Sequence, residues 1–159
     1  MTRVPLMLAV LAAACLPPDK TDAPHVAPVD PDVVATAHRW TVEDHVRGGN
    51  TALTEGDAIL MHGRVVRIGA DDYSSPFNGS CDTVKRAKRT RKLDDILPEV
   101  EISGEGRRAA IRFGLTPVLD EYRLTCDSSA HATTLVLYVA GKRGMTCFSG
   151  VCYLLAATD

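Results

Sequence analysis

The stretch 133-TTLVLYVAGKRGMTCFSGVCYLLAA-157 decides the fold of this chain. Residues 133–140 are β-branched and apolar almost without interruption, which predicts a strand buried on both faces. The glycines of 141–144 predict a turn, and 152–157 is a last strand. The cysteines of CFSGVC, residues 147–152, then stand at the facing ends of the last two strands. The stretch therefore predicts a β-hairpin whose loop is fastened by its own cysteines.

The cysteine count supports a disulfide-bearing domain. Of five cysteines, Cys81, Cys126, Cys147 and Cys152 form an even set, for which two disulfides are the default in an exported chain. Three pairings are possible. Chain entropy gives about 2 kcal/mol for the small Cys147–Cys152 ring and about 4 kcal/mol for Cys81–Cys126, but crossed pairings would give more, so energy leaves the choice open. The short loop favours the local pair.

The amino-terminal residues predict export. Residues 1–14 have one basic residue and then an apolar run that ends in three alanines, as in a cleavable signal. That run would be about 16 Å long as a helix, which is too short to span a bilayer. Residues 15–37 hold most of the prolines among Asp, Ala and Val, which predicts an extended tether. Residues 38–159 form one domain by length.

The sequence L-A-A-A-C, from Leu11 to Cys15, resembles the lipobox of bacterial lipoproteins. The resemblance implies cleavage before Cys15, a diacylglyceryl thioether on its sulfur and an acylated amino terminus, which together anchor a protein stably. Leu16 stands where Asp would mark inner-membrane retention, so the resemblance implies the outer membrane, facing the periplasm or the cell surface. The alternative is ordinary secretion with a free Cys15.

The first part of the domain predicts a strand, a helix and a second strand. In 40-WTVEDHV-46, alternation places Trp40, Val42 and Val46 on one face and His45 on the other. Residues 54–63 predict a short helix, because Thr54 and Asp57 have capping-box spacing and Gly63 is a stop signal. Residues 64–69 alternate again, as a strand does.

The remaining segments are mostly β in pattern. Residues 99–103 and 107–114, joined by GEG, predict a hairpin, and 121–126 predicts a strand with Tyr122, Leu124 and Cys126 on one side. Many short strands with Gly-rich turns and one or two short helices predict a mainly β domain: a small antiparallel β-barrel or sandwich, stapled by disulfides.

Catalytic and metal-binding motifs are weak. Only His38 and His45, with two carboxylates between them, approach ligand spacing, and a solvated strand edge explains them better than a metal site. Ser149 and His131 belong to no nucleophile motif, and four residues rather than two separate the cysteines of CFSGVC, unlike a redox pair. We therefore expect no enzyme activity, no metal and no cofactor.

A basic segment, 85-KRAKRTRK-92, lies in a chain whose net charge is −2. It lacks the interleaved aromatic residues of a nucleic-acid site. One interpretation is attraction to anionic lipid or lipopolysaccharide, and the other is a solvated loop or helix end whose charges meet Asp94 and Asp95. The candidate anionic-surface patch consists of Lys85, Arg86, Lys88, Arg89, Arg91 and Lys92.

Ser149, Gly150 and Tyr153 fit the pattern S-G-x-x-Y, which resembles the loop of the lipoprotein inhibitors of C-type lysozyme. Those proteins are small, disulfide-bearing β-barrels, and the resemblance implies that Ser149 and Tyr153 contact a lysozyme cleft. A second resemblance, to the calycin barrels of exported lipoproteins, rests on an early tryptophan, a short helix and a final G-x-x-Y-x-L. It implies a barrel that can enclose a small apolar ligand.

The sequence thus predicts a membrane-anchored extracytoplasmic lipoprotein with a non-catalytic binding domain whose ligand it does not name. Inhibition of a lysozyme-type hydrolase through the Ser149–Tyr153 loop is the alternative. The expected partners are the membrane, through the lipid on Cys15, and a protein or an anionic envelope component, with no nucleic acid.

Overall fold

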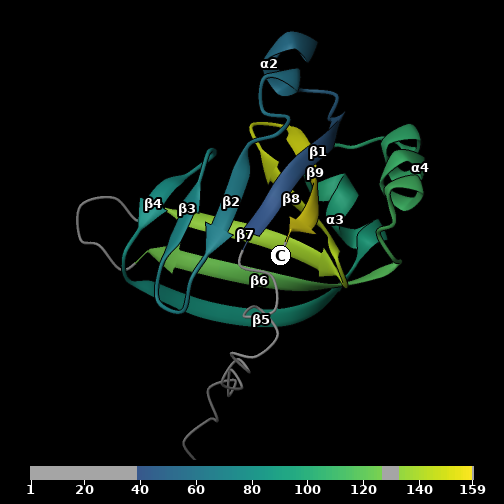
Figure 1. The fold of residues 1–159 in the computed structure, drawn as a ribbon. Helices are drawn as coiled ribbons and strands as arrows, with labels where there is room; N and C mark the ends of the chain where they lie inside the picture. The colour runs from purple at the N-terminus through teal and green to yellow at the C-terminus, as the bar shows by residue number, and fades with distance from the viewer. Residues whose placement is uncertain (1–38, 127–132, 159) are drawn as a thin grey trace, which may run out of the picture.

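The computed structural model describes residues 39–126 and 133–158 (Figure 1). The predicted signal 1–14, the tether 15–37 with Cys15, and His38 and His131 lie outside the described residues. None of the helices within these bounds is long and apolar enough to cross a membrane. The described elements are β1 Arg39–Arg47, α2 Glu55–Ile59, β2 Val65–Ile68, β3 Tyr73–Ser75, β4 Gly79–Cys81, β5 Val84–Lys92, α3 Leu93–Glu99, α4 Gly104–Phe113, β6 Val118–Cys126, β7 Thr134–Ala140, β8 Arg143–Phe148 and β9 Val151–Thr158.

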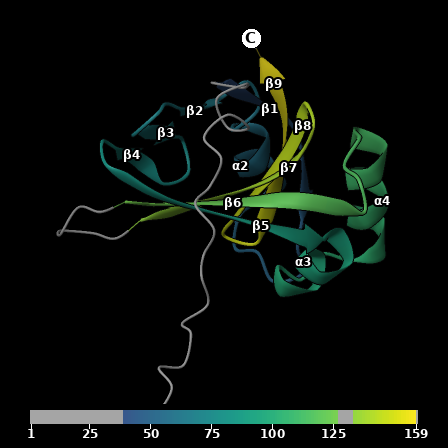
Figure 2. The same cartoon turned by 90° about the horizontal axis from the view of Figure 1, so that it is seen from below.

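The described strands form a single antiparallel sheet in the order β4-β3-β2-β1-β9-β8-β7-β6-β5. The first and last described strands therefore pair at its centre. The sheet curls into a half-barrel, so that β2–β4 arch over β6 and β7 (Figures 1 and 2). The predicted fold class, mainly β and antiparallel with disulfides, is confirmed, with three described helices where one or two were expected.

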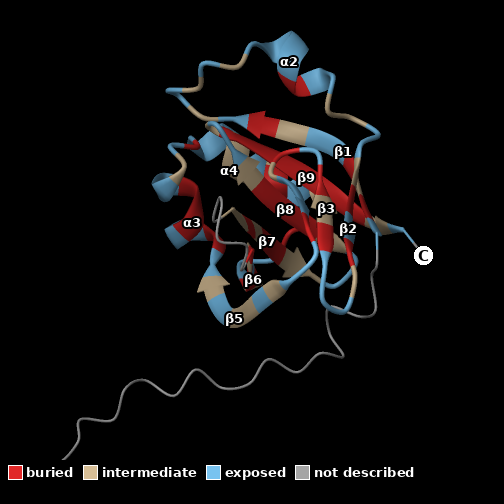
Figure 3. Cartoon of the chain, turned by 90° about the vertical axis from the view of Figure 1, so that its left-hand side faces the viewer, coloured by how far each residue is buried: buried red, intermediate tan, exposed pale blue. Residues whose placement is uncertain are grey.

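The core has two parts, one on each face of the sheet. The inner face, enclosed by the curl, carries Trp40, Tyr153 and Leu155, and the outer face carries Leu154 and the buried residues of α3 and α4. β9 is buried on both faces from Val151 to Ala156, as Figure 3 shows. A strand with no solvent side suits a sequence without polar alternation. The same argument predicted β7, in which Leu135, Leu137 and Tyr138 are buried and the other residues are half-buried.

Both disulfides of the favoured pairing are present, Cys81–Cys126 and Cys147–Cys152. Cys81 ends β4, one edge of the sheet, and Cys126 ends β6, next to the other edge. The backbone N–H of Val84 adds a hydrogen bond of 3.0 Å to the carbonyl of Asp71. The long-range disulfide therefore holds the two ends of the curled sheet together.

The alternation predicted for β1 is wrong after Val42. Val42 pairs with Leu155 and Asp44 with Leu154, so Glu43 is an extra residue and the strand has a β-bulge. One extra residue exchanges the faces of everything that follows. Val46 therefore belongs to the outer cluster, and His45, expected opposite Trp40, pairs with the inner residue Tyr153.

The hairpin predicted for 99–114 is also wrong. Residues 104–113 form α4, which begins after Ser103 and ends at Gly114 in the left-handed conformation. Two alanines and three arginines favour a helix, and helical spacing puts Ala109, Ala110 and Phe113 against the outer cluster. Gly106 lies so close to Ile102 that a Cβ would come within 2.4 Å of it. Residues 99–103 are the end of α3 and a turn.

The capping box predicted for the first helix is confirmed. Thr54 is the N-cap of α2; its hydroxyl accepts from the N–H of Asp57, and the Asp57 carboxylate accepts from the N–H of Thr54. The helix is shorter than predicted, and residues 60–63 continue it as turns. Ala58, on its inner side, is completely buried in the inner cluster.

A buried carboxylate, Glu121 of β6, holds the basic strand β5 in place. Its side chain is 1% exposed; Arg89 binds it with two hydrogen bonds of 2.8 and 2.9 Å, and Arg91 and Arg123 lie at 3.2 and 3.4 Å. Burial alone would raise the pKa of Glu121, but the Arg89 hydrogen bonds and the three arginine charges lower it below its ordinary value. The carboxylate is therefore ionised and fully paired.

We predict that Glu121→Gln lowers the free energy of unfolding by about 2 kcal/mol, because it leaves three guanidinium groups without their buried partner. Urea unfolding followed by circular dichroism measures this loss. Glu99→Gln, which removes an exposed carboxylate from Arg91, is the matched control, with a loss below about 1 kcal/mol.

The pH dependence supplies a second check. Since the folded pKa is lowered, the contribution of Glu121 is complete above the unfolded pKa and disappears as the pH falls through the folded one. The difference in stability between the wild type and Glu121→Gln should therefore close below about pH 4. A difference that persists unchanged at lower pH would contradict the assignment.

Candidate functional site

The tip of the β8–β9 hairpin is the predicted partner-binding loop. Cys147 pairs with Cys152 and Phe148 with Val151, so Ser149 and Gly150 alone make the turn. Their φ angles, 50° and 78°, are the two positive values of a type I′ turn, which matches the twist of a hairpin. The predicted four-residue loop is thus one more strand pair and a two-residue turn.

The tip is tied to the loop that follows β1. The carbonyl of Gly150 accepts a hydrogen bond of 2.7 Å from the N–H of Gly48, and the carbonyl of Ser149 accepts one of 2.7 Å from the hydroxyl of Thr51. Gly150 packs so closely that a Cβ would lie 2.9 Å from that of Thr51. The backbone of the tip is therefore fixed, while the side chains of Phe148 and Ser149 are exposed.

A pocket of about 270 Å³ lies beside the tip. One wall is the hairpin from Cys147 to Gly150, and the other is Asn50 with the turn between α3 and α4. Glu101 in that turn has a φ of 56°, and its carbonyl accepts from the N–H of Gly49 at 3.1 Å. Hydrogen-bonded backbone on both walls makes this a preformed surface pocket.

Tyr153, the third residue of the predicted loop, does not share this surface. It is 1% exposed on the inner face, where its ring stacks on Phe77 at 4.5 Å, and Phe77 in turn lies 6.1 Å from Phe148. Burial raises the pKa of Tyr153, and the charge of Asp57 raises it further, so the phenol stays neutral. Tyr153 supports the hairpin from inside, and Ser149 and Gly150 are the members of the motif at the tip.

The basic segment 85–92 is strand β5, an edge of the sheet, rather than the loop or helix end considered from sequence. Its register with β6 divides the candidate patch between two faces. Lys88 sits on the inner side with Asp120 at 3.0 Å and its ammonium over the ring of Tyr122, whereas Arg89 and Arg91 bind Glu121 on the outer side. Asp94, expected to meet these charges, binds Arg107 instead.

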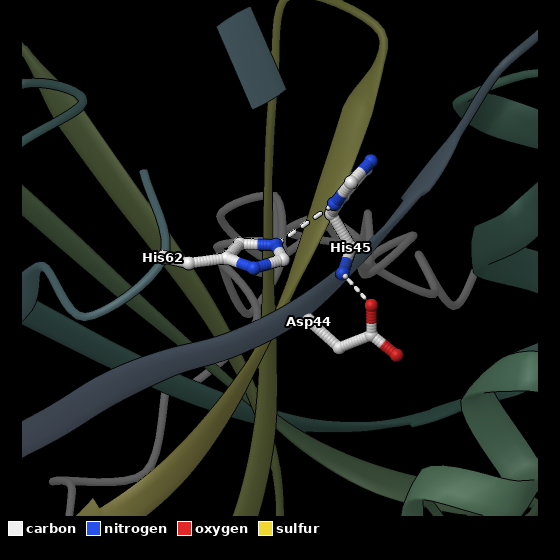
Figure 4. Close-up of side chains that lie close together, drawn as sticks. All are labelled: Asp44, His45 and His62. Carbon is white, nitrogen blue, oxygen red and sulfur yellow. Dashed lines mark hydrogen bonds between the residues drawn. The ribbon is translucent and has the colours of Figure 1, made fainter. Parts of the chain in front are cut away.

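A pair of histidines, which the sequence does not bring together, meets at the bulged end of β1. Nδ1 of His45 lies 2.9 Å from Nε2 of His62, which comes from the turn after α2 (Figure 4). The other nitrogen of His45, Nε2, lies 3.1 Å from the carboxylate of Glu55, the first residue of α2. The side chain of His45 is only 7% exposed.

Asp44 completes this group. Its carboxylate accepts a hydrogen bond of 2.8 Å from the N–H of His45, and one of its oxygens lies within 4.8 Å of both imidazoles. A pocket of about 460 Å³, between this end of β1 and α4, reaches the group and is lined by Asp44, His45 and Glu55 among others. Asp44 and His45 were considered as ligands only together with His38, which is outside the described residues. His62 gave no signal in the sequence.

Comparisons with protein families, with curated proteins and with solved structures find no match for this chain. The class that the fold itself defines is a disulfide-bearing, curled antiparallel β domain with preformed surface pockets.

We predict that Gly150→Ala lowers the free energy of unfolding by about 2 to 3 kcal/mol, from the positive φ and from the overlap of the new methyl group with Thr51. Gly79→Ala is the matched control, because Gly79 has the same φ of 78° but open space at its Cβ position. It should lose only about 1 kcal/mol. Urea unfolding of both variants measures the difference. Equal losses of unfolding free energy would show that the contact with Thr51 does not contribute to stability.

Proposed function

We propose that this chain is a lipid-anchored, extracytoplasmic binding protein whose domain recognises a partner through the tip of the β8–β9 hairpin. The observation that carries the proposal is the construction of that tip. A disulfide, a type I′ turn and hydrogen bonds from Gly48 and Thr51 fix its backbone, although it bears an exposed phenylalanine and borders a pocket. A fixed loop with an exposed aromatic residue binds at low entropic cost.

The two disulfides support the extracytoplasmic part of the proposal. Structural disulfides persist in oxidising compartments, outside the cytoplasm, and here one closes the curl of the sheet and the other the tip. The anchor itself rests on the lipobox resemblance at Cys15. It is the tether of residues 15–37 that would let the domain reach a partner some distance from the lipid surface.

The anchor predicts a clear change in partitioning. In a bacterial host with the lipoprotein maturation machinery, we expect the wild-type chain in the membrane fraction and Cys15→Ser in the soluble envelope extract, because the variant has no sulfur to acylate. Mass spectrometry of the mature wild-type protein should show an amino-terminal acylated Cys15. An unmodified Cys15 in the mature chain would rule out the anchor.

The tip can be tested by photocrosslinking in the same cells. A benzoylphenylalanine at Phe148, which is 37% exposed, should give a discrete product with another envelope protein, and Ser149→Arg in the same chain should abolish it. Ile111 on α4, 39% exposed, is the control position for the same probe and should give none. Indistinguishable products from both positions would contradict a binding role for the tip.

Inhibition of a lysozyme-type hydrolase remains the second candidate, carried by the exposed Ser149 in the S-G-x-x-Y pattern. The test is whether the purified protein, at micromolar concentration, slows the lysis of cell walls by a C-type lysozyme. With Tyr153 inside the sheet, the contact would have to be made by Phe148, Ser149 and Gly150, so loss of inhibition in Ser149→Arg is the specific expectation.

A further inference from the structure

We propose that His45, His62 and Asp44 form a binding site for a divalent first-row transition metal ion, Zn²⁺ being the reference case. The site lies outside the hairpin tip and is independent of the function proposed for the tip. It brings together two neighbouring residues of β1, which follow the β-bulge, and a residue from the turn after α2.

The spacing of the two imidazoles is close to what a shared metal ion requires. Zn–N bonds of about 2.0 to 2.1 Å at a tetrahedral angle separate two ligand nitrogens by about 3.3 Å. Nδ1 of His45 and Nε2 of His62 are 2.9 Å apart and already face each other. The two nitrogens must move apart by about 0.4 Å to make room for the ion, and a small rotation of either ring is enough for this.

Glu55 selects the tautomer that such a site needs. Its carboxylate lies 3.1 Å from Nε2 of His45 and so favours the tautomer that carries the proton on Nε2, which leaves the lone pair of Nδ1 directed at His62. Arg47, 3.8 Å from the other oxygen of Glu55, lies on the far side of that carboxylate. A carboxylate behind a metal-binding histidine is the usual outer-shell arrangement, since it fixes the ring and strengthens the ligand.

The third ligand is Asp44, the residue before His45. Neighbouring residues of a strand point to opposite faces, and after the bulge Asp44 pairs with the outer residue Leu154 while His45 pairs with the inner residue Tyr153. An Asp44 oxygen nevertheless lies within 4.8 Å of one nitrogen of each imidazole. Because Asp44 is exposed, its carboxylate can rotate over the remaining distance.

The donor set also indicates the class of ion. Two imidazole nitrogens and one carboxylate oxygen suit Zn²⁺, Cu²⁺, Ni²⁺ or Fe²⁺, whereas Ca²⁺ and Mg²⁺ require a cage of oxygens. Three protein ligands leave one position for water or for a ligand arriving through the 460 Å³ pocket, which opens at Asp44 and His45. The site therefore has the open form rather than the closed four-ligand form.

The site can be tested by calorimetric titration of the purified full chain with Zn²⁺. Both disulfides are kept oxidised. We expect one ion per chain near neutral pH, at least tenfold weaker binding in His45→Ala and in His62→Ala, and weaker binding in Asp44→Asn. Mg²⁺ at the same concentrations should give no heat of binding.

Two control variants match the ligands. Glu43→Gln removes the carboxylate of the residue next to Asp44; the Glu43 carboxylate binds Arg143 in the structure. His131→Gln removes a histidine that lies outside the described residues. Both should bind Zn²⁺ as the wild type does. Unchanged binding in the His45→Ala/His62→Ala double variant, or no binding by the wild type at millimolar Zn²⁺, would overturn the proposal.

A measurement on the wild type alone keeps the proposal testable if a variant fails to fold. With Co²⁺ in place of Zn²⁺, a site with two nitrogens and one oxygen should give the visible absorption of a low-coordinate ion. Imidazole NMR signals of two histidines should shift together on titration with Zn²⁺. Shifts in no histidine, or in histidines other than His45 and His62, would also overturn the assignment.

Discussion

The pairing of β1 with β9 is the constraint on which the rest of the structure depends. It joins the two ends of the described domain at the centre of the sheet, and it runs from Arg39 with Thr158 to Arg47 with Val151 with one interruption at Glu43. β9, buried on both faces, contributes to both clusters of the core. The interruption turns the second half of β1 over, so that Val46 meets α4 while His45 meets Tyr153. One inserted residue thereby decides which side chains line each face.

The sequence patterns that predicted the fold correctly are those in which local chemistry and tertiary environment agree. The apolar run of β7, the capping box at Thr54 and the cysteine-flanked turn at Ser149 each have a local physical cause that the fold preserves. The patterns failed where a tertiary contact decided the outcome. Residues 107–114 were predicted to be a strand after a GEG turn, but 104–113 form a helix whose Ala110 packs against the outer face. No sequence periodicity indicates the bulge at Glu43.

The candidate sites show the same division. The Ser149–Gly150 turn could be found from sequence because all of its determinants lie within six residues, and the structure changes mainly the role of Tyr153, which is interior. The His45–His62 pair could not be found, since the two residues belong to different elements and meet only through the bulge and the turn after α2. The basic residues of 85–92 were visible, but their partner Glu121 lies in another strand, and strand geometry divides them between two faces.

The central position of β1 and β9 also governs the order in which the molecule can be assembled. Arg39 and Thr158 are 119 residues apart, so the middle of the sheet cannot close until the end of the chain is available. Contacts of such long range are slow to form, and the two cysteine pairs, which do not cross along the chain, can be joined one after the other as the residues emerge. Until β9 arrives, β1 is paired on one side only, with β2. In a chain synthesised from its amino terminus, the other side of β1 therefore stays an open strand edge until the last strand is in place.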